Sequence, residues 1–323
     1  MPKNGNIDAG LTPPPLAEAA DRAQLPPFAS LLKSRDVEDP VNLWVHRPLA
    51  YGIVAAIYRS SITPNQITLI AMLVGCAAGI CWFIGTPKLV VTGGALLWAS
   101  SILDGADGIL ARAKRMQSEV GRALDGTADA VVGVVSMAGA WYYVWRTQPH
   151  SWLPWGLVAA MVTAILQIYM YDYYKEIFLH ATVPGRGPLS ETPEAVAARL
   201  QRARDQGAPW VVIASLRAHV LMVTNQRRVV RLTNPQSEVI ERAPTSAASA
   251  QDYRRLHYGP MQLWALLSLC PHSYLLALSA LFQRIDLYVW FRVFGASAMF
   301  LIVLVWQRIV TNKSVRATHT AEG

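Results

Sequence analysis

The chain has 323 residues, of which 53% are hydrophobic and 15% are charged, well below the roughly 25% charged residues of an ordinary soluble domain. This composition excludes a disordered protein and argues against a water-soluble one. The net charge of +8 is no sign of nucleic-acid binding, because basic loops also orient membrane proteins. The cysteines Cys76, Cys81 and Cys270 lie in apolar stretches without metal-binding spacing, so we expect buried thiols.

The first 64 residues contain two segments of different character. Residues 1–40 are rich in proline and alanine and have no basic start before an apolar core, so we expect a flexible cytoplasmic tail and no cleaved signal peptide. In residues 41–64, apolar side chains such as Leu43, Trp44 and Ile53 alternate with polar ones at helical spacing. This pattern predicts an amphipathic helix in the membrane interface; a solvent-exposed bundle helix is the alternative.

Six apolar stretches that follow are long enough to cross a bilayer. They are residues 65–86, 89–112, 122–146, 152–173, 258–282 and 286–308. The predicted fold is therefore an all-α integral membrane protein with six transmembrane helices preceded by the interfacial helix. Helices 1–4 occupy residues 65–172 and helices 5 and 6 occupy residues 257–310, before a C-terminal tail at residues 311–323.

The distribution of Lys and Arg predicts the orientation of these helices. With the N-terminus inside, 25 of these residues fall in inner segments, whereas Lys88, Arg146 and Arg284 are the three in outer connections. Both termini are therefore predicted to be cytoplasmic, in the inner membrane if the source is bacterial. Residues 173–256 form a hydrophilic cytoplasmic insert with a predicted helix at 193–206. Its basic segment would face anionic lipid headgroups or simply be a solvated linker.

Four aspartates interrupt the second and third predicted spans. Asp104 and Asp107 are three residues apart and Asp125 and Asp129 four, so each pair shares one helix face. In an antiparallel hairpin turning near residue 116, Asp107 is level with Asp125, and Asp104 with Asp129. Clustered acids in a membrane are costly unless cations neutralise them. Two Mg²⁺ ions would do so, with Mn²⁺ as a possible substitute, and paired metals suit phosphoryl transfer.

The spacing D-x2-D-G-x2-A-R-x8-G-x3-D-x3-D resembles the signature of the CDP-alcohol phosphatidyltransferase family. The matching positions are Asp104, Asp107, Gly108, Ala111, Arg112, Gly121, Asp125 and Asp129. Pro64, Asn65 and Thr68 at the start of the first span, and the layout of six spans, are also similar to that family. The resemblance covers residues 41–172 well and the last two spans in outline, but it does not extend to the insert.

The resemblance implies an enzyme of phospholipid biosynthesis, acting from the cytoplasmic side as a homodimer. It would transfer the phospho-alcohol of a CDP-linked donor, chiefly the phosphatidyl group of CDP-diacylglycerol, to an acceptor alcohol and release CMP. Asp104, Asp107 and Asp125 would hold one metal, and Asp104, Asp125 and Asp129 a second, with Asp129 also the general base. The implied substrate-binding residues are Gly108, Ala111, Arg112, Ser118, Gly121, Asn65 and Thr68, although a helix cap at 63–65 explains Asn65 and Thr68 equally well.

Other interpretations stay open. The donor could be a soluble CDP-alcohol such as CDP-inositol, with a lipid or polyol-phosphate acceptor. A divalent-cation transporter also needs acidic residues in its spans, and a scaffold with a retired active site is a further class. His257, Tyr258 and Gln262 are placed where they could meet the acceptor. Arg292 could bind an acceptor phosphate, but snorkelling to the outer interface is the favoured reading.

Overall fold

The computed structural model describes residues 25–31, 35–183, 189, 192–242 and 247–322, and the secondary structure in these residues is helical throughout. Residues 1–24 of the predicted tail and the Pro/Gly-rich start of the insert at 184–188 lie outside the described residues. The elements are η1 (Phe28–Leu31), η2 (Arg35–Val37), η3 (Asn42–His46), α2 (Arg47–Ile57), α3 (Pro64–Ile84), α4 (Pro87–Ala113), α5 (Glu119–Thr147), α6 (Leu153–Thr182), α7 (Pro193–Asp205), α8 (Trp210–Thr233), α9 (Ser237–Arg242), α10 (Ala247–Leu266), α11 (Leu269–Leu281), α12 (Ile285–Trp290), η4 (Phe291–Gly295) and α13 (Ala296–Glu322).

Within the described residues, five helices are long and apolar enough to cross a membrane, and the number is six if α10 and α11 are counted as one span. These two helices are bent by 46° at the break between them, so the fifth predicted span is not one straight helix. Pro271 explains the break, because it has no N–H to bond the carbonyl of Leu267 and its ring clashes with that turn. The last span runs continuously over Ile285–Arg316.

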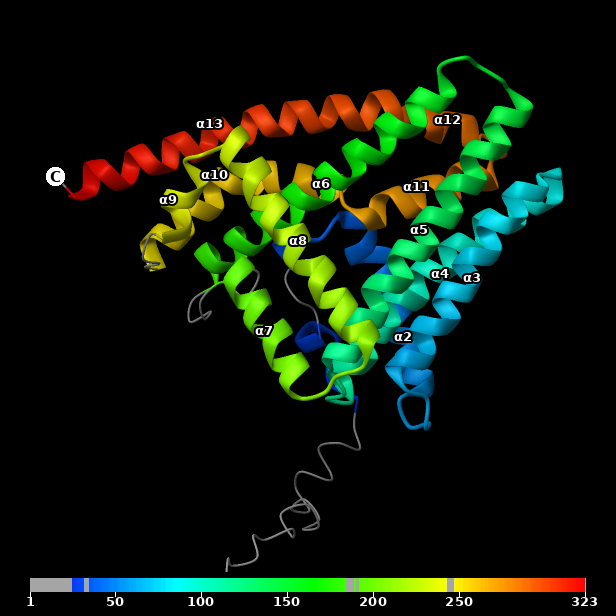
Figure 1. The fold of residues 1–323 in the computed structure, drawn as a ribbon, viewed down its shortest axis with the longest axis horizontal. Helices are drawn as coiled ribbons and strands as arrows, with labels where there is room; N and C mark the ends of the chain where they lie inside the picture. Colours follow the sequence, from blue (N-terminus) through cyan, green and yellow to red (C-terminus); the bar gives the residue numbers. More distant parts are fainter. Residues whose placement is uncertain (1–24, 32–34, 184–188, 190–191, 243–246, 323) are drawn as a thin grey trace, which may run out of the picture.

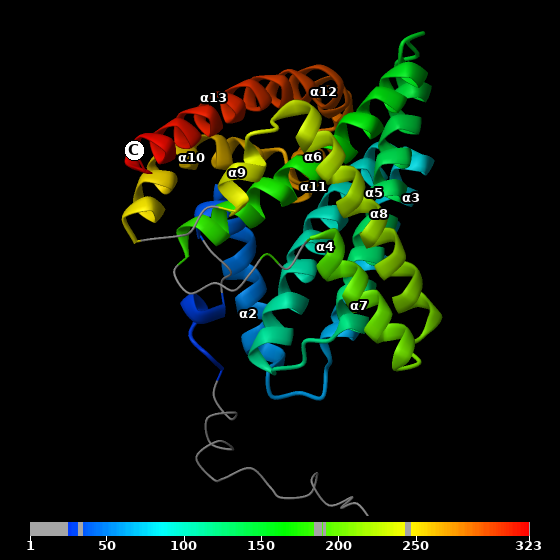
Figure 2. The same cartoon turned by 60° about the vertical axis from the view of Figure 1, so that its left-hand side comes forward.

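Helices α3, α4 and α5 lie side by side at one end of the molecule (Figures 1 and 2), and α4 and α5 pack mainly against α3 instead of against each other. Glycines permit the close approach of α3 and α5: a Cβ built on Gly79 would lie 2.5 Å from the carbonyl oxygen of Val135. Small residues at a helix interface allow such backbone contacts in membranes. Because α4 and α5 both pack on α3 and barely contact each other, their polar faces are free to form a site.

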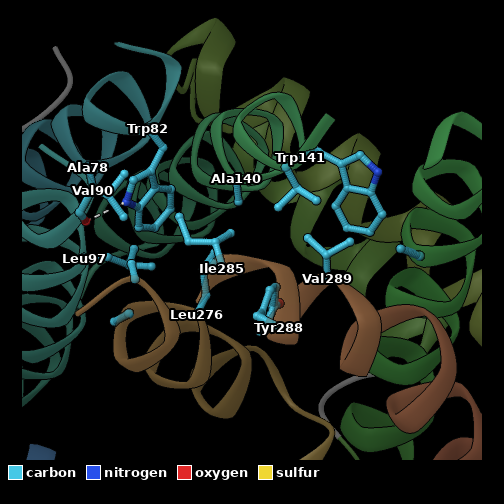
Figure 3. Packing of buried hydrophobic residues seen from close by; sticks show 14 of the residues in the cluster. Ala78, Trp82, Val90, Leu97, Ala140, Trp141, Leu276, Ile285, Tyr288 and Val289 are labelled. Carbon is cyan, nitrogen blue, oxygen red and sulfur yellow. Dashed lines mark hydrogen bonds between the residues drawn. The ribbon is translucent and has the colours of Figure 1, made fainter. Parts of the chain in front are cut away.

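A cluster of large buried side chains fixes the end of this trio that is remote from the aspartates. Figure 3 shows Trp82 against Ile285, and Trp141 beside Val289, in the space between α3, α5, α11 and α12. The Trp82 Nε1–H donates to the carbonyl oxygen of Val90 at 3.1 Å, which satisfies the buried indole. This packing joins the loop between α3 and α4 to the last spans and places α11 along α4.

The predicted amphipathic helix forms as η3 and α2 but ends at Ile57, before the turn that leads to α3. One face of α2 packs on α4, with Ala50 and Val54 fully buried, whereas Trp44 and Leu49 are exposed on the other side. Exposed apolar side chains such as Trp44 and Leu49 are typical of a helix that lies in the membrane interface. The interfacial location stays a prediction.

The insert is helical and packs on the spans. Its first helix, α7, agrees with the prediction for 193–206 and pairs with α8 (Figure 1). Helix α8 contacts α5 and α6, and Gln226 donates from Nε2 to the carbonyl oxygen of Tyr169 at 2.8 Å. The insert is therefore attached to the helical core.

The described part of the N-terminal segment corrects the expectation of a flexible tail up to residue 40. Val37, Glu38 and Asp39 are buried. Glu38 accepts hydrogen bonds from the Arg47 guanidinium, and Asp39 accepts one from the backbone N–H of Asn42. These partners order the segment, because buried carboxylates are stable only when they are hydrogen-bonded or paired.

Polar residues of the last spans also differ from expectation. Arg292 does not snorkel: it is 1% exposed and donates from Nη2 to the carbonyl oxygen of Ala160 at 2.7 Å. His257 contacts Ser314 and Gln307 and so joins α10 to α13. Gln262 donates to the carbonyl oxygen of Asp36. Neither His257 nor Gln262 lines the cavity described below, so their predicted contact with an acceptor is not supported.

Candidate active site

Four carboxylates meet between α4 and α5. Carboxylate oxygens of Asp104, Asp107 and Asp125 lie within 4.8 Å of one another, and the Asp129 side chain is hydrogen-bonded to Asp104. The residue pairs that the hairpin places level with each other are therefore neighbours. The helices turn between Ala113 and Glu119, around the expected position. Like charges this close repel strongly unless protons or cations compensate them.

The turn between α4 and α5 is held by local hydrogen bonds that fix the start of α5. The Ser118 hydroxyl oxygen caps α5 by accepting from the backbone N–H of Gly121 at 3.0 Å. A Cβ on Gly121 would lie 3.2 Å from both the Asn65 Oδ1 and the Ser118 Oγ. Asn65, Ser118 and Gly121 are therefore brought together where α5 begins, and their contact with a substrate stays a prediction.

Thr68 has a different immediate task from the one implied by the family resemblance. Its hydroxyl donates to the Asp107 carboxylate, and both side chains are buried. The cap of α3 is Thr63, in a capping box with Gln66, so Asn65 and Thr68 are not the capping residues. Thr68 is thus a positioning residue for Asp107.

Replacing Thr68 with valine is expected to lower activity and metal affinity by roughly 10–100-fold, the usual cost of losing an outer hydrogen bond to a ligand. Valine keeps the shape and removes only the donor. The matched control is Thr92→Val, because the Thr92 hydroxyl donates only to the Lys88 carbonyl of its own helix. CMP release measured over a range of Mg²⁺ concentrations checks the prediction, and equal Mg²⁺ dependence in the two variants would contradict it.

Arg112 lies beside Gly108 on α4. Its Nη1 would be 3.5 Å from a Cβ built on Gly108, and its Nε–H donates to the carbonyl oxygen of Leu31 at 2.8 Å. The Nη2 atom is buried and has no hydrogen-bond partner. A buried guanidinium nitrogen without a partner is costly, and a phosphate oxygen would satisfy it. Ala111, the other small motif residue on α4, is half-buried.

The donor set of the site fits hard divalent cations. Carboxylate oxygens are the ligands that Mg²⁺ prefers, and oxygens of three of these carboxylates lie within 4.8 Å of one another, a grouping that could hold a metal ion. Arg47, Arg112 and Lys175 are cationic side chains near the cluster. Arg47 is paired with Glu38 and Lys175 with Asp172, so these cations do not balance the four carboxylates. Asp104, Asp107 and Asp125 would therefore hold a metal, and Asp129, in contact with Asp104, is placed to join them.

A cavity of about 270 Å³ opens beside Asp104 and Asp129. Its other walls come from the N-terminal segment, α6 and α11, and include Glu38, Arg47 and Lys175. The sequence did not point to these three residues. Glu38 lay in the presumed tail and Lys175 at the presumed start of the insert, and Arg47 was one of the polar residues of the predicted amphipathic helix.

Asp39 also lines this cavity and is held by two donors. The backbone N–H of Asn42 donates to its Oδ1 at 2.9 Å, and the Tyr274 hydroxyl donates to the same atom at 3.4 Å. Burial raises the pKa of the Asp39 carboxyl above its ordinary value. Because Tyr274 belongs to α11, this contact ties the N-terminal segment to the last spans.

Comparison with known proteins finds matches to part of the chain. Residues 61–189 match the family model described as CDP-alcohol phosphatidyltransferase. The chain is 37% identical over 94 residues to a protein of Archaeoglobus fulgidus named bifunctional IPC transferase and DIPP synthase, a stretch that covers 29% of this chain and 18% of that protein. It is 32% identical over 115 residues to the protein of the same name in Aquifex aeolicus, covering 35% of this chain and 25% of the relative.

A third relative is the phosphatidylinositol phosphate synthase of Mycobacteroides abscessus. It is 26% identical over 142 residues, which cover 44% of this chain and 62% of the relative. This chain therefore spans less than two thirds of the length of each of these relatives. The family match includes α4 and α5, which hold the aspartates, whereas the N-terminal segment and α11 lie outside it.

The helices long enough to span a bilayer indicate an integral membrane protein, and a carboxylate cluster with an adjoining cavity lies among its helices. Residues 61–189 match the CDP-alcohol phosphatidyltransferase family, and this matched part of the chain holds helices α3 to α6.

Proposed function

We propose that the protein transfers a phosphatidyl group from CDP-diacylglycerol to a small acceptor alcohol and releases CMP. The observation that supports this most is the meeting of Asp104, Asp107, Asp125 and Asp129 between α4 and α5 in the spacing of the family. In the reaction, the acceptor oxygen forms a bond to the phosphorus that carries the alcohol, and the bond from that phosphorus to CMP breaks. The proton of the acceptor hydroxyl must leave as the new bond forms.

Each side chain of the site has a proposed task. Asp104, Asp107 and Asp125 hold one divalent cation, and Asp104, Asp125 and Asp129 a second; when bound, the cations supply Lewis-acid stabilisation of the diphosphate charge. Asp129 borders the cavity and accepts the proton of the acceptor hydroxyl. Arg112 donates to the diphosphate through its unpartnered Nη2. Gly108, Ala111, Gly121, Asn65 and Ser118 surround the nucleotide.

The surface of α5 beside the aspartates supports a lipid donor. A Cβ built on Gly126 or Gly133 would meet no atom within 4 Å, and Val134 on the next position is exposed. An uncovered apolar helix face next to the phosphate site gives acyl chains a route from the bilayer to the reacting centre. A soluble donor would not need this opening.

CMP release tests the proposal. Purified full-length protein with Mg²⁺ and labelled CDP-diacylglycerol is expected to release CMP in proportion to added acceptor alcohol, with the labelled lipid appearing in a phosphodiester. Release from CDP-inositol but not from CDP-diacylglycerol would assign the soluble donor instead. Entry of Mg²⁺ into proteoliposomes without any CMP release would assign the transporter class, which the gathering of the carboxylates at one depth disfavours.

A further inference from the structure

The cavity beside Asp129 is the place where an acceptor hydroxyl can reach that carboxylate. Its volume of about 270 Å³ is near the lower end of the ~300–1,000 Å³ typical of small-molecule sites. It accommodates a small alcohol and excludes a two-chain lipid. If this cavity binds the acceptor of the proposed reaction, the residues of its walls determine which acceptor the protein uses.

Each cation in the cavity wall already has a carboxylate partner. The Arg47 Nε and Nη2 donate to the two Glu38 oxygens at 3.0 and 3.2 Å, and Asn42 donates to Glu38 as well. The Lys175 Nζ lies 2.9 Å from Asp172 Oδ1. A phosphorylated acceptor would have to compete with the largely buried Glu38 for Arg47 and with the half-buried Asp172 for Lys175. A phosphate group therefore gains little binding energy from Arg47 and Lys175, because each of these cations is already paired with a carboxylate.

The remaining wall groups suit hydroxyl groups. Ser101 and Ser273 each donate their hydroxyl proton to a carbonyl of their own helix, at 3.1 and 3.3 Å. Ser268, at the break between α10 and α11, donates to the Ala265 carbonyl at 2.7 Å. Their oxygens keep lone pairs that accept hydrogen bonds, whereas ammonium and guanidinium groups offer only donors. Hydroxyl groups both donate and accept, so a molecule with several of them can use both kinds of wall group.

We propose that the acceptor is a small uncharged polyol, and that the Glu38–Arg47 and Asp172–Lys175 ion pairs exclude its phosphorylated form. The proposal rests on the proposed function, because it assigns the cavity to the acceptor. Glu38 and Arg47 lie before the family match at residues 61–189, so this one of the two ion pairs comes from a part of the chain that the family model does not cover.

The test compares each polyol with its own phosphate. Purified full-length protein with Mg²⁺ and CDP-diacylglycerol is given glycerol or glycerol 3-phosphate, and myo-inositol or myo-inositol 1-phosphate. We expect a kcat/KM for CMP release at least about tenfold higher with one of the uncharged polyols than with its phosphate, the scale set by one charge-assisted hydrogen bond. Calorimetric binding of the same four compounds without donor gives a readout that needs no turnover.

Two variants each remove the carboxylate partner of one cation and leave the four-aspartate cluster between α4 and α5 unchanged. Glu38→Gln removes the partner of Arg47, and Asp172→Asn removes that of Lys175. Each is expected to improve use and binding of the phosphorylated form by about tenfold. Glu238→Gln is the control. Glu238 forms an ion pair with Arg231 at 2.5 Å, and neither residue lines the cavity. Two variants are used so that a folding defect in one does not decide the result.

The possible results distinguish a failure of the uncharged-polyol assignment from a failure of the proposed transferase function. Preference of the unaltered protein for a polyol phosphate, or an unchanged preference in both variants, would overturn the uncharged-polyol assignment while leaving the transferase intact. If no acceptor releases CMP, the proposed function fails, and the binding data alone judge the cavity: tighter binding of an uncharged polyol supports the assignment, and tighter binding of a phosphate or no binding at all overturns it.

Discussion

Asp104→Asn is expected to lower the rate of CMP release by roughly 10³-fold while raising the thermal stability of the metal-free protein. Asp104 is the centre of the cluster, since it lies within 4.8 Å of Asp107 and Asp125 and is also hydrogen-bonded to Asp129. Its loss removes an anionic ligand that would serve both cations. In the metal-free protein the same change relieves repulsion among buried like charges, so function and stability move in opposite directions.

A loss of activity together with a gain in stability distinguishes a residue of the active site from a structural one. Asp205→Asn makes the same chemical change on the insert, where Asp205 accepts a hydrogen bond from Gln201, and it should alter neither quantity. Activity is measured as CMP release and stability as the unfolding temperature in detergent, with and without Mg²⁺. A stable, fully active Asp104→Asn protein would refute the assignment of the cluster, and loss of both activity and stability would indicate a structural role only.

Removal of divalent cations is expected to abolish CMP release, and Mg²⁺ or Mn²⁺ should restore it. Four carboxylates between two helices repel one another, and cations that bind only the folded protein neutralise them and stabilise the fold. At a concentration of 100 Kd this linkage amounts to about 2.7 kcal/mol. The unfolding temperature should therefore rise with added Mg²⁺ in the unaltered protein and much less in Asp104→Asn.

The matched measurement uses the same protein with EDTA, followed by titration with MgCl₂. Recovery of activity and the rise in unfolding temperature should follow one binding curve, because both report occupation of the same carboxylates. Activity that persists in EDTA would contradict a metal-dependent transfer. A rise in stability without any recovery of activity would mean that the cation site and the reacting centre are different.

Much of the helical framework could be predicted because it depends on local sequence. Apolar stretches of about twenty residues define the spans, and helical spacing alone places Asp104 and Asp107 on one face of α4. The hairpin between α4 and α5 brings Asp125 to the level of Asp107, since an antiparallel pair with a short turn has only one register. The roles of these residues in metal binding and catalysis stay predictions.

Other features escaped prediction because they depend on contacts far apart in the chain. The burial of Glu38 and Asp39 requires Arg47 and Tyr274, so composition alone could not distinguish this segment from a flexible tail. Thr68 was assigned to the nucleotide, but the structure shows its bond to Asp107 across two helices. The membrane orientation and the homodimer are not tested by these contacts and stay predictions.

The sequence by itself determined that the chain is a helical membrane protein with four aspartates on facing helices, because hydrophobic length and helical periodicity are properties of neighbouring residues. Only the tertiary structure decided what surrounds those aspartates: the wedge of α3 that separates α4 from α5, the break between α10 and α11, and the ion-paired cavity wall supplied by Glu38, Arg47 and Lys175. The reason is that charge neutralisation and cavity shape arise from residues brought together by packing, over separations that no local pattern encodes.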